Sequence, residues 1–329
     1  MDLPPAPPRP VAGGAPLFGT YAGACEVVSW DGLSGRWARG PLWRFTHGKR
    51  WHYVSLTGPR VIAAFAIVDV GYAANAFAYV FDREAHKLRA DLGLLGPPRI
   101  SAEVSDRPAA GARSTFARAG AVLRIERRGD TWELYARAPG GLLIEAELDA
   151  AAAPPTVCAI QEIQGGLANC THKTSCLPAR GAIEAGGALF DLDGHTGALD
   201  HTLGLLARET RWRWASAQRR ELGFNLSSGF MANVENVVWH RGRVHAVGSA
   251  EILFDTAATD GPWRVRTQDG AVDLTFRPEG ERRQDQDLVV AASRYVQPFG
   301  TFHGTVRVDG YEVEVRDLPG VTEDHTARW

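Results

Sequence analysis

Two short stretches of the chain place aspartate and histidine side by side, where either could move a proton. Asp200-His201-Thr202 lies inside FDLDGHTGALDHTLG, and Asp324-His325-Thr326 lies in the last ten residues, GVTEDHTARW. An aspartate in an apolar pocket has a pKa raised by up to about 3–5 units, so it can stay protonated and donate to an alkene or carbonyl. The candidate catalytic residues are therefore Asp200, His201, Asp324 and His325.

The alternative role of the two triplets is structural. Neighbours on a strand point to opposite faces, so Asp200 and Thr202 share one face and His201 lies on the other. In this interpretation the triplets end the two halves of the chain and meet where the halves join, and a carboxylate pairs there with an imidazole. A pocket-facing acid is the competing hypothesis.

Alternating polar and aromatic side chains in later segments predict a ligand-binding wall. RWRW puts its tryptophans on one face and its arginines on the other, and GFNLSSGF alternates in the same way. The alternatives are core packing for the tryptophans and a solvated strand face for the polar residues. The candidate ligand-binding residues are Trp212, Trp214, Asn225, Ser227, Glu235, Asn236 and His303.

The cysteines give a weak indication of a metal site. Cys158, Cys170 and Cys176 lie with His172 within 19 residues, but no CxxC pair occurs. Structural zinc sites usually show such tight pairs, so we expect no metal, no disulfide and no cofactor. A cluster of His195, His201, Asp324 and His325 is the alternative metal site. No P-loop, GxGxxG after a strand, GxSxG or HExxH motif occurs either, so nucleotide cofactors and serine-hydrolase chemistry are unsupported.

Composition narrows the partners. The 329 residues carry a net charge of −2, so no basic field attracts nucleic acid or anionic lipid. The chain has no run of eighteen apolar residues, the length that would predict a membrane-spanning helix. The start, MDLPPAPPRPVAGGAP, has no apolar core of a secretory signal, so we expect a cytoplasmic protein with a disordered Pro-rich tail over residues 1–15. The oligomeric state is left open.

Strand patterns run through nearly the whole chain. AVLRIERRGDTWELYARAPGGLLIEAELDA alternates apolar and polar residues and turns at Gly129-Asp130 and at Pro139-Gly140-Gly141. Many short strands at even spacing predict an all-β protein, and barrel closure removes exposed edges. We predict two antiparallel barrels packed together, over residues 16–205 and 206–329.

Longer motifs resemble a known bacterial family. IVDVGYAANAFAYVFD, HKTSCLPARG, GFNLSSGF, RYVQPFGTFHG and LPGVTEDHTARW resemble domain of unknown function 2804, over roughly residues 17–329. More distantly, GALDHTLG and WRWAS are similar to the centre of the carotenoid 1,2-hydratase group, which includes kievitone hydratase, fungal Diels–Alderases and tocopherol cyclase. That group usually has a tryptophan beside the Asp-His segment, where this chain has Leu199 and Thr202-Leu203.

The distant resemblance implies tandem lipocalin-like barrels and two functions of different class. The first is a cofactor-independent hydratase, cyclase or isomerase that acts by Asp/His acid–base chemistry on a hydrophobic lipid, isoprenoid or polyketide-like molecule. The second is a non-catalytic lipocalin-like carrier or stress-related binding protein. Both need an apolar cavity, and carboxylates facing that cavity distinguish the enzyme from the carrier.

Overall fold

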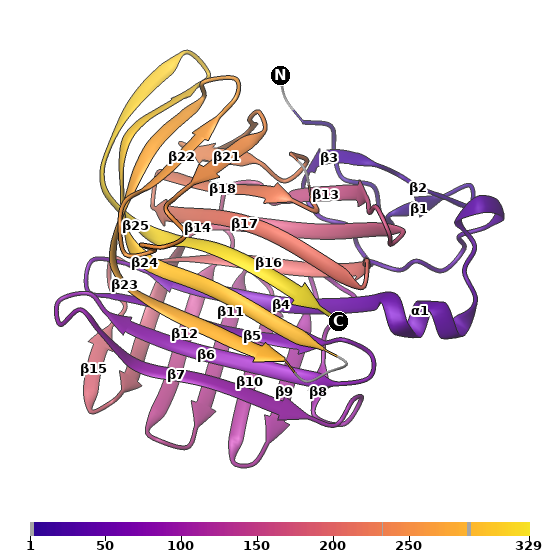
Figure 1. Ribbon diagram of the computed structural model, residues 1–329, viewed down its shortest axis with the longest axis horizontal. Helices are drawn as coiled ribbons and strands as arrows, with labels where there is room; N and C mark the ends of the chain where they lie inside the picture. Colours follow the sequence, from indigo (N-terminus) through magenta and orange to yellow (C-terminus); the bar gives the residue numbers. More distant parts are fainter. Residues whose placement is uncertain (1–2, 232, 288–290) are drawn as a thin grey trace.

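The computed structural model describes residues 3–231, 233–287 and 291–329 (Figure 1). Strands account for 63% of the chain and helices for 3%, which confirms the all-β prediction. The two largest sheets are a nearly closed barrel followed in the chain by a half-barrel, and the two pack together. The predicted pair of packed barrels is thus confirmed, with the difference that the second is open.

The first barrel is a 14-stranded antiparallel sheet in the order β7-β6-β5-β4-β16-β14-β12-β11-β10-β9-β8, with β3, β13 and β15 branching from it. Its strands are β3 (Gly19–Ala22), β4 (Gly48–Thr57), β5 (Val61–Asp69), β6 (Ala74–Asp82), β7 (Lys87–Gly96), β8 (Ala102–Glu103), β9 (Arg113–Arg118), β10 (Ala121–Arg128), β11 (Thr131–Ala138), β12 (Leu142–Asp149), β13 (Val157–Glu162), β14 (Ala168–Ala185), β15 (Ala188–Asp191) and β16 (Thr196–Leu205).

The half-barrel is a 9-stranded sheet in the order β20-β19-β18-β17-β25-β24-β23-β22-β21. Its strands are β17 (Glu209–Arg219), β18 (Leu222–Gly229), β19 (Val237–His240), β20 (Arg243–Ala246), β21 (Ala250–Leu253), β22 (Trp263–Thr267), β23 (Val272–Asp287), β24 (Ala292–Val308) and β25 (Tyr311–Arg328). The last strand of the first sheet ends at Leu205, and the first strand of the second begins at Glu209.

Each sheet has its own core, and a third apolar layer joins them. Along β5, Phe65 and its alternate neighbours fill the first barrel, while Ile62 and its alternate neighbours face the second sheet. Phe299 of β24 and Val321 of β25 complete this joining layer. VIAAFAIV is apolar throughout because both of its faces are covered.

β14 is the strand that bends between its neighbours. Its first half pairs with β13 and β16 and its second half with β12 and β15. The register shifts between Thr174 and Leu177, where Cys176 takes a positive φ of 62°. Such a bulge re-aims a strand, and here it separates a cavity-facing half from a half that closes the barrel.

The Pro-rich start makes definite contacts that the prediction of a disordered tail did not include. β1 (Val11–Ala12) pairs with β2 (Ala15–Pro16), and the backbone of Ala6 and Pro4 bonds to Ala22 at the end of β3. The helical pieces, η1 (Gly35–Trp37) and α1 (Pro41–His47), follow this segment. No helix in the described parts of the chain is long and apolar enough to cross a membrane.

Candidate functional site

A cavity of about 580 Å³ lies between the two sheets. One wall is the face of β4–β7, β14 and β16 that points away from the first barrel's core, and the other is the matching face of β17, β18 and β23–β25. The volume is within the range of about 300–1,000 Å³ usual for drug-sized ligands. The interior of each barrel is instead filled by apolar side chains, so the cavity belongs to the junction.

The cavity has an aromatic lining with a few converging polar groups. Its large apolar residues include Trp51, Tyr53, Val68, Tyr72, Phe77, Trp212, Trp214, Phe230, Met231 and Trp329. Its charged and amide residues include Asp91, Asn169, Lys173, Asp200, Glu235, Arg282, Gln297, Glu323 and His325. Such a lining suits a mainly apolar molecule that carries a small number of polar groups.

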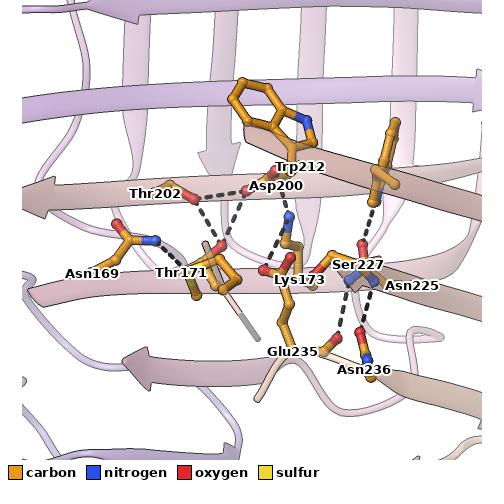
Figure 2. Close-up of polar contacts among 12 residues, drawn as sticks. Asn169, Thr171, Lys173, Asp200, Thr202, Trp212, Asn225, Ser227, Glu235 and Asn236 are labelled. Atoms are coloured by element: carbon orange, nitrogen blue, oxygen red, sulfur yellow. Dashed lines mark hydrogen bonds and ion pairs between the residues drawn. The ribbon is translucent and has the colours of Figure 1, made fainter. Parts of the chain in front are cut away.

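A buried lysine organises the first polar group (Figure 2). Lys173 Nζ lies 2.6 Å from Asp200 Oδ2 and 3.6 Å from Glu235 Oε2. The hydroxyls of Thr171 and Thr202 also donate to Asp200 Oδ1, at 3.2 and 2.9 Å. Burial alone would lower the pKa of Lys173, but the two carboxylates outweigh it and raise that pKa. These contacts make Asp200 an acceptor held by donors rather than the isolated proton donor considered from the sequence.

Amides behind the cavity wall hold this group in place (Figure 2). Trp214 Nε1 donates to Asn225 Oδ1 at 2.8 Å, and Asn225 Nδ2 donates to the backbone oxygen of Glu235 at 3.0 Å. Asn236 Oδ1 accepts the backbone N–H of Ser227 at 2.7 Å. Asn225 and Asn236 therefore position the lining residues without lining the cavity themselves.

The second polar group is built on β24 and β25. Glu323 Oε1 lies 3.2 Å from His325 Nδ1, and Ser293 Oγ lies 3.0 Å from His325 Nε2. Trp212 Nε1 donates to Glu323 at 2.8 Å, and Gln297 donates to its other oxygen. Burial would raise the pKa of Glu323, but hydrogen bonding and charge attraction by His325 lower it, with help from Trp212 and Arg282.

The ionised Glu323 fixes the tautomer of its neighbour. A carboxylate can only accept, so His325 presents N–H at Nδ1 to Glu323 and keeps Nε2 as the proton-exchanging nitrogen. Ser293 then donates its hydroxyl to Nε2. The arrangement has the order of a carboxylate-oriented histidine base facing a hydroxyl, which can take up or deliver a proton.

Arg282 of β23 ties the two walls together. Its guanidinium lies 3.0 Å from Asp91 of β7 and within 5.0 Å of the ring centroids of Phe77, Tyr79 and Tyr295. Burial raises the pKa of the Tyr295 hydroxyl to about 12. Tyr295 therefore stays a neutral donor at the edge of the cavity at any ordinary pH.

The structure brings some of the sequence-predicted residues into this cavity and leaves others outside. Asp200, His325, Trp212, Trp214, Ser227 and Glu235 line it. His201 instead points into the first barrel, where its Nε2 lies 2.7 Å from the backbone oxygen of Ser105. Burial, then the neighbouring His172, lowers the pKa of His201 to about 3.

Two further predicted residues lie away from the cavity. Asp324 points to the core side of the half-barrel and accepts from Arg213 Nε at 2.9 Å. His303 contacts Thr301 Oγ1 at 3.0 Å and is not among the lining residues. In the first triplet the aspartate faces the cavity, and in the second the histidine does. The even-numbered residues of this part of β16 line the cavity, whereas the odd-numbered residues next to Asp324 in β25 do.

Several lining residues were missed from the sequence. Lys173 and Glu323 are the most consequential, followed by Arg282 and Ser293. Glu323 had a signal, because it precedes His325 by two residues and must share its strand face. Lys173 had none locally, since its pairing with Asp200 depends on the register of β14 against β16.

The fold defines a class: two packed lipocalin-like sheets with a cavity at their junction. Within that class, the chain belongs to the family described as "Domain of unknown function (DUF2804)", whose model matches residues 17–329. This confirms the resemblance stated from the motifs. No curated protein sequence matches the chain.

Solved structures support the fold. The chain is similar to a protein described as AttH from Nitrosomonas europaea, with a TM-score of 0.52 and 13% identity over 90% of this chain and 98% of that one. CghA with Sch210972 gives a TM-score of 0.54 and 12% identity over 86% and 89% of the chains. Kievitone hydratase from Nectria haematococca gives 0.47 and 9% identity, over 86% and 89%. At these identities the likeness concerns the fold alone.

Proposed function

We propose that the protein binds a mainly apolar small molecule in the junction cavity and exchanges a proton with it through His325, without an organic cofactor. The observation that carries this proposal is a histidine oriented by the ionised Glu323 on the wall of an aromatic cavity. Hydration, cyclisation and isomerisation of an isoprenoid, lipid or polyketide-like molecule are the reaction classes that need no more than this. The similarity to AttH and CghA supports the fold of this chain and not the proposed reaction.

The two polar groups would have different roles, one in proton transfer and the other in ligand binding. His325 Nε2 is the atom that takes or gives the proton, and general acid–base catalysis of this kind contributes about 10²–10⁴-fold. Lys173 and Asp200 offer a donor and an acceptor to a polar end of the ligand, while Trp212 and Trp214 provide flat apolar walls. Orientation of the ligand between these groups supplies the remaining rate enhancement.

The test begins with the ligand that the protein retains. Native mass spectrometry of protein purified from its source cells, followed by extraction, identifies the bound molecule by mass. The extracted molecule is then incubated with apo protein in D₂O and separately in H₂¹⁸O. Deuterium uptake indicates proton exchange by a base, and ¹⁸O uptake indicates hydration.

His325→Gln is the informative variant, and Thr326→Ala, at the exposed neighbouring position of the same strand, is its control. We expect His325→Gln to keep ligand binding and to lose isotope uptake by about 10²-fold or more. Thr326→Ala should behave as wild type. Equal isotope uptake in wild type and His325→Gln would refute the role of His325.

A binding protein without chemistry is the second candidate function. It is favoured by the internal pairing of Lys173 with Asp200 and Glu235, which leaves these groups satisfied before any ligand arrives. A retained ligand with no isotope uptake in wild type or variants would select the carrier over the enzyme. A carrier should also lose affinity, rather than turnover, when Trp214 is replaced by alanine.

Ser293 adds a chemical check on the enzyme class. Its hydroxyl lies 3.0 Å from His325 Nε2, in the order that activates a serine nucleophile. Labelling of Ser293 by a fluorophosphonate, lost in His325→Gln, would show acyl transfer and exclude simple acid–base chemistry. An unlabelled Ser293 agrees with the proposed proton exchange.

A further inference from the structure

Three cysteines and a histidine converge inside the first barrel, behind the wall of the junction cavity. The Sγ atoms of Cys25 and Cys158 are 3.7 Å apart, and those of Cys158 and Cys170 are 4.0 Å apart. Together with a ring nitrogen of His172, one ligand atom from each residue lies within 4.8 Å of every other. All four side chains are buried, with at most 2% of any of them exposed.

Strand register explains how these residues meet although they are far apart in the chain. Cys158 of β13 lies directly opposite His172 of β14, and Cys170 shares the face of His172 because it is two residues away. β3 pairs with the other edge of β13, where Tyr21 lies opposite Cys158. The loop that follows β3 then brings Cys25 next to Cys158.

The loop that carries Cys25 is itself fixed. Gly23 N–H donates to the backbone oxygen of Thr156 at 2.6 Å, and Glu26 N–H donates to that of Pro8 at 2.9 Å. Gly23 takes a positive φ of 96°, which a side chain would strain. The approach of Cys25 to the other ligands is thus held by the backbone.

The spacing fits a tetrahedral metal better than the other states open to cysteines. A zinc–sulfur bond of about 2.3 Å places two sulfurs of a tetrahedron about 3.8 Å apart, close to the observed separations. A disulfide needs sulfurs about 2.05 Å apart, and all four cysteines are free. Ordinary apolar packing does not require a polar imidazole beside three thiols.

The polar atoms of the cluster are also incompletely satisfied. The backbone N–H of Cys25 donates to His172 Nε2 at 3.1 Å, but His172 Nδ1 has no hydrogen-bond partner among the described residues. A buried, unsatisfied ring nitrogen beside three sulfur donors is an environment that a cation stabilises.

We propose that Cys25, Cys158, Cys170 and His172 bind one Zn²⁺ in a closed, structural Cys₃His site. Three sulfurs and one nitrogen in a tetrahedron are a typical zinc donor set, and burial leaves no position for water or substrate. Binding forms three sulfur–zinc bonds and one nitrogen–zinc bond and releases the three thiol protons to solvent. This proposal departs from our expectation of no metal, and it stands independently of the proposed function.

The site has a mechanical consequence for the cavity wall. Cys170 and His172 alternate along β14 with Asn169, Thr171 and Lys173, of which Asn169 and Lys173 line the cavity from the opposite face. Zinc would therefore fix the strand that presents Lys173 to the ligand, and would join it to β13 and to the N-terminal loop.

The direct test is the metal content of tag-free protein prepared under reducing conditions without chelator. Inductively coupled plasma mass spectrometry should find about one zinc per chain. Cys158→Ser and Cys170→Ser should reduce this at least about tenfold, while Cys176→Ser keeps it. Cys176 is the matched control, because it is equally buried and lies on β14 but outside the cluster.

A second measurement does not depend on the variants folding. Wild-type protein is unfolded with chelator, refolded without metal and titrated with Co²⁺ and then Zn²⁺. We expect thiolate-to-cobalt charge-transfer absorption and tetrahedral d–d bands that zinc displaces, together with proton release and a higher melting temperature. Metal-free native protein that takes up neither ion would overturn the proposal, as would stoichiometric iron or a Cys25–Cys158 disulfide in the native protein.

Discussion

Replacing Lys173 by methionine tests the electrostatics of the cavity wall. The lysine side chain is 9% exposed, and its partners Asp200 and Glu235 are 16% and 6% exposed. Methionine keeps most of the apolar stem, so the main effect is to leave two buried carboxylates without their cation. Breaking a buried pair in this way costs about 3–5 kcal/mol, or roughly 4–7 °C in melting temperature for a chain of 329 residues.

The pH dependence gives the sign of the effect. The raised pKa of Lys173 means that its contribution is complete below the unfolded pKa of about 10.4, and is lost as pH rises through the higher folded value. Urea denaturation at pH 7, followed by circular dichroism, therefore measures the whole contribution. In Lys173→Met the deficit should shrink as pH falls toward 4, because the unpaired carboxylates become protonated.

Two controls separate charge from packing. Lys87→Met, at an exposed position of β7, should change the free energy of unfolding by no more than about 0.5 kcal/mol. Adding Asp200→Asn and Glu235→Gln to Lys173→Met should recover much of the lost stability. A loss below about 1 kcal/mol in Lys173→Met, or no recovery in the triple variant, would refute the paired cluster.

Three other variants test further parts of the structure. Glu323→Gln should destabilise the protein by about 1–3 kcal/mol at pH 7. The difference should shrink as pH falls below the unfolded pKa of about 4.3, because the contribution of a carboxyl with a lowered pKa is lost as pH falls through its folded value; a pH-independent difference contradicts this. Wild-type stability should fall as pH drops from about 6.5 toward 3, by up to about 1.4 kcal/mol per pH unit for His201, because the unfolded chain binds a proton that the buried imidazole does not. His201→Phe should reduce this slope in urea titrations at several pH values, and an unchanged slope would exclude a buried neutral histidine. Deleting residues 1–10 removes backbone bonds to Ala22 and Glu26 and should lower stability by about 1 kcal/mol for each. An unchanged melting temperature would instead support the prediction of a disordered tail.

The sequence predicted the parts of the fold that depend on local periodicity. The meander of residues 121–149 alternates as expected, and its turns fall where the glycines stand. Strand parity also placed Asp200 and Thr202 on a shared face opposite His201 correctly. Parity alone could not say which face of β25 meets the cavity, because both Asp324 and His325 are polar.

What the sequence could not give depends on contacts between distant strands. Lys173 meets Asp200 across 27 residues, and Cys25 meets Cys158 across 133. Zinc ligands on paired strands stand two residues apart or directly across a ladder, so a search for CxxC passes over them. The continuous apolar sequence of β5 did indicate that both faces of this strand are buried, and hence that a second layer packs against it.

The position of the cavity between two sheets also bears on how such a protein diversifies. The shape of a pocket inside a barrel changes only when the core of that barrel repacks, and a close-packed core is sensitive to a volume change of even one methylene group. Here each wall is the back of a sheet whose core lies on its other side, so substitutions at Trp214 or Phe77 alter the chamber while Phe65 and Phe302 keep their packing. A small slide of one sheet along the joining layer would reshape the chamber as a whole. At such apolar positions of the lining, the shape of the cavity can therefore change without repacking the core of either sheet.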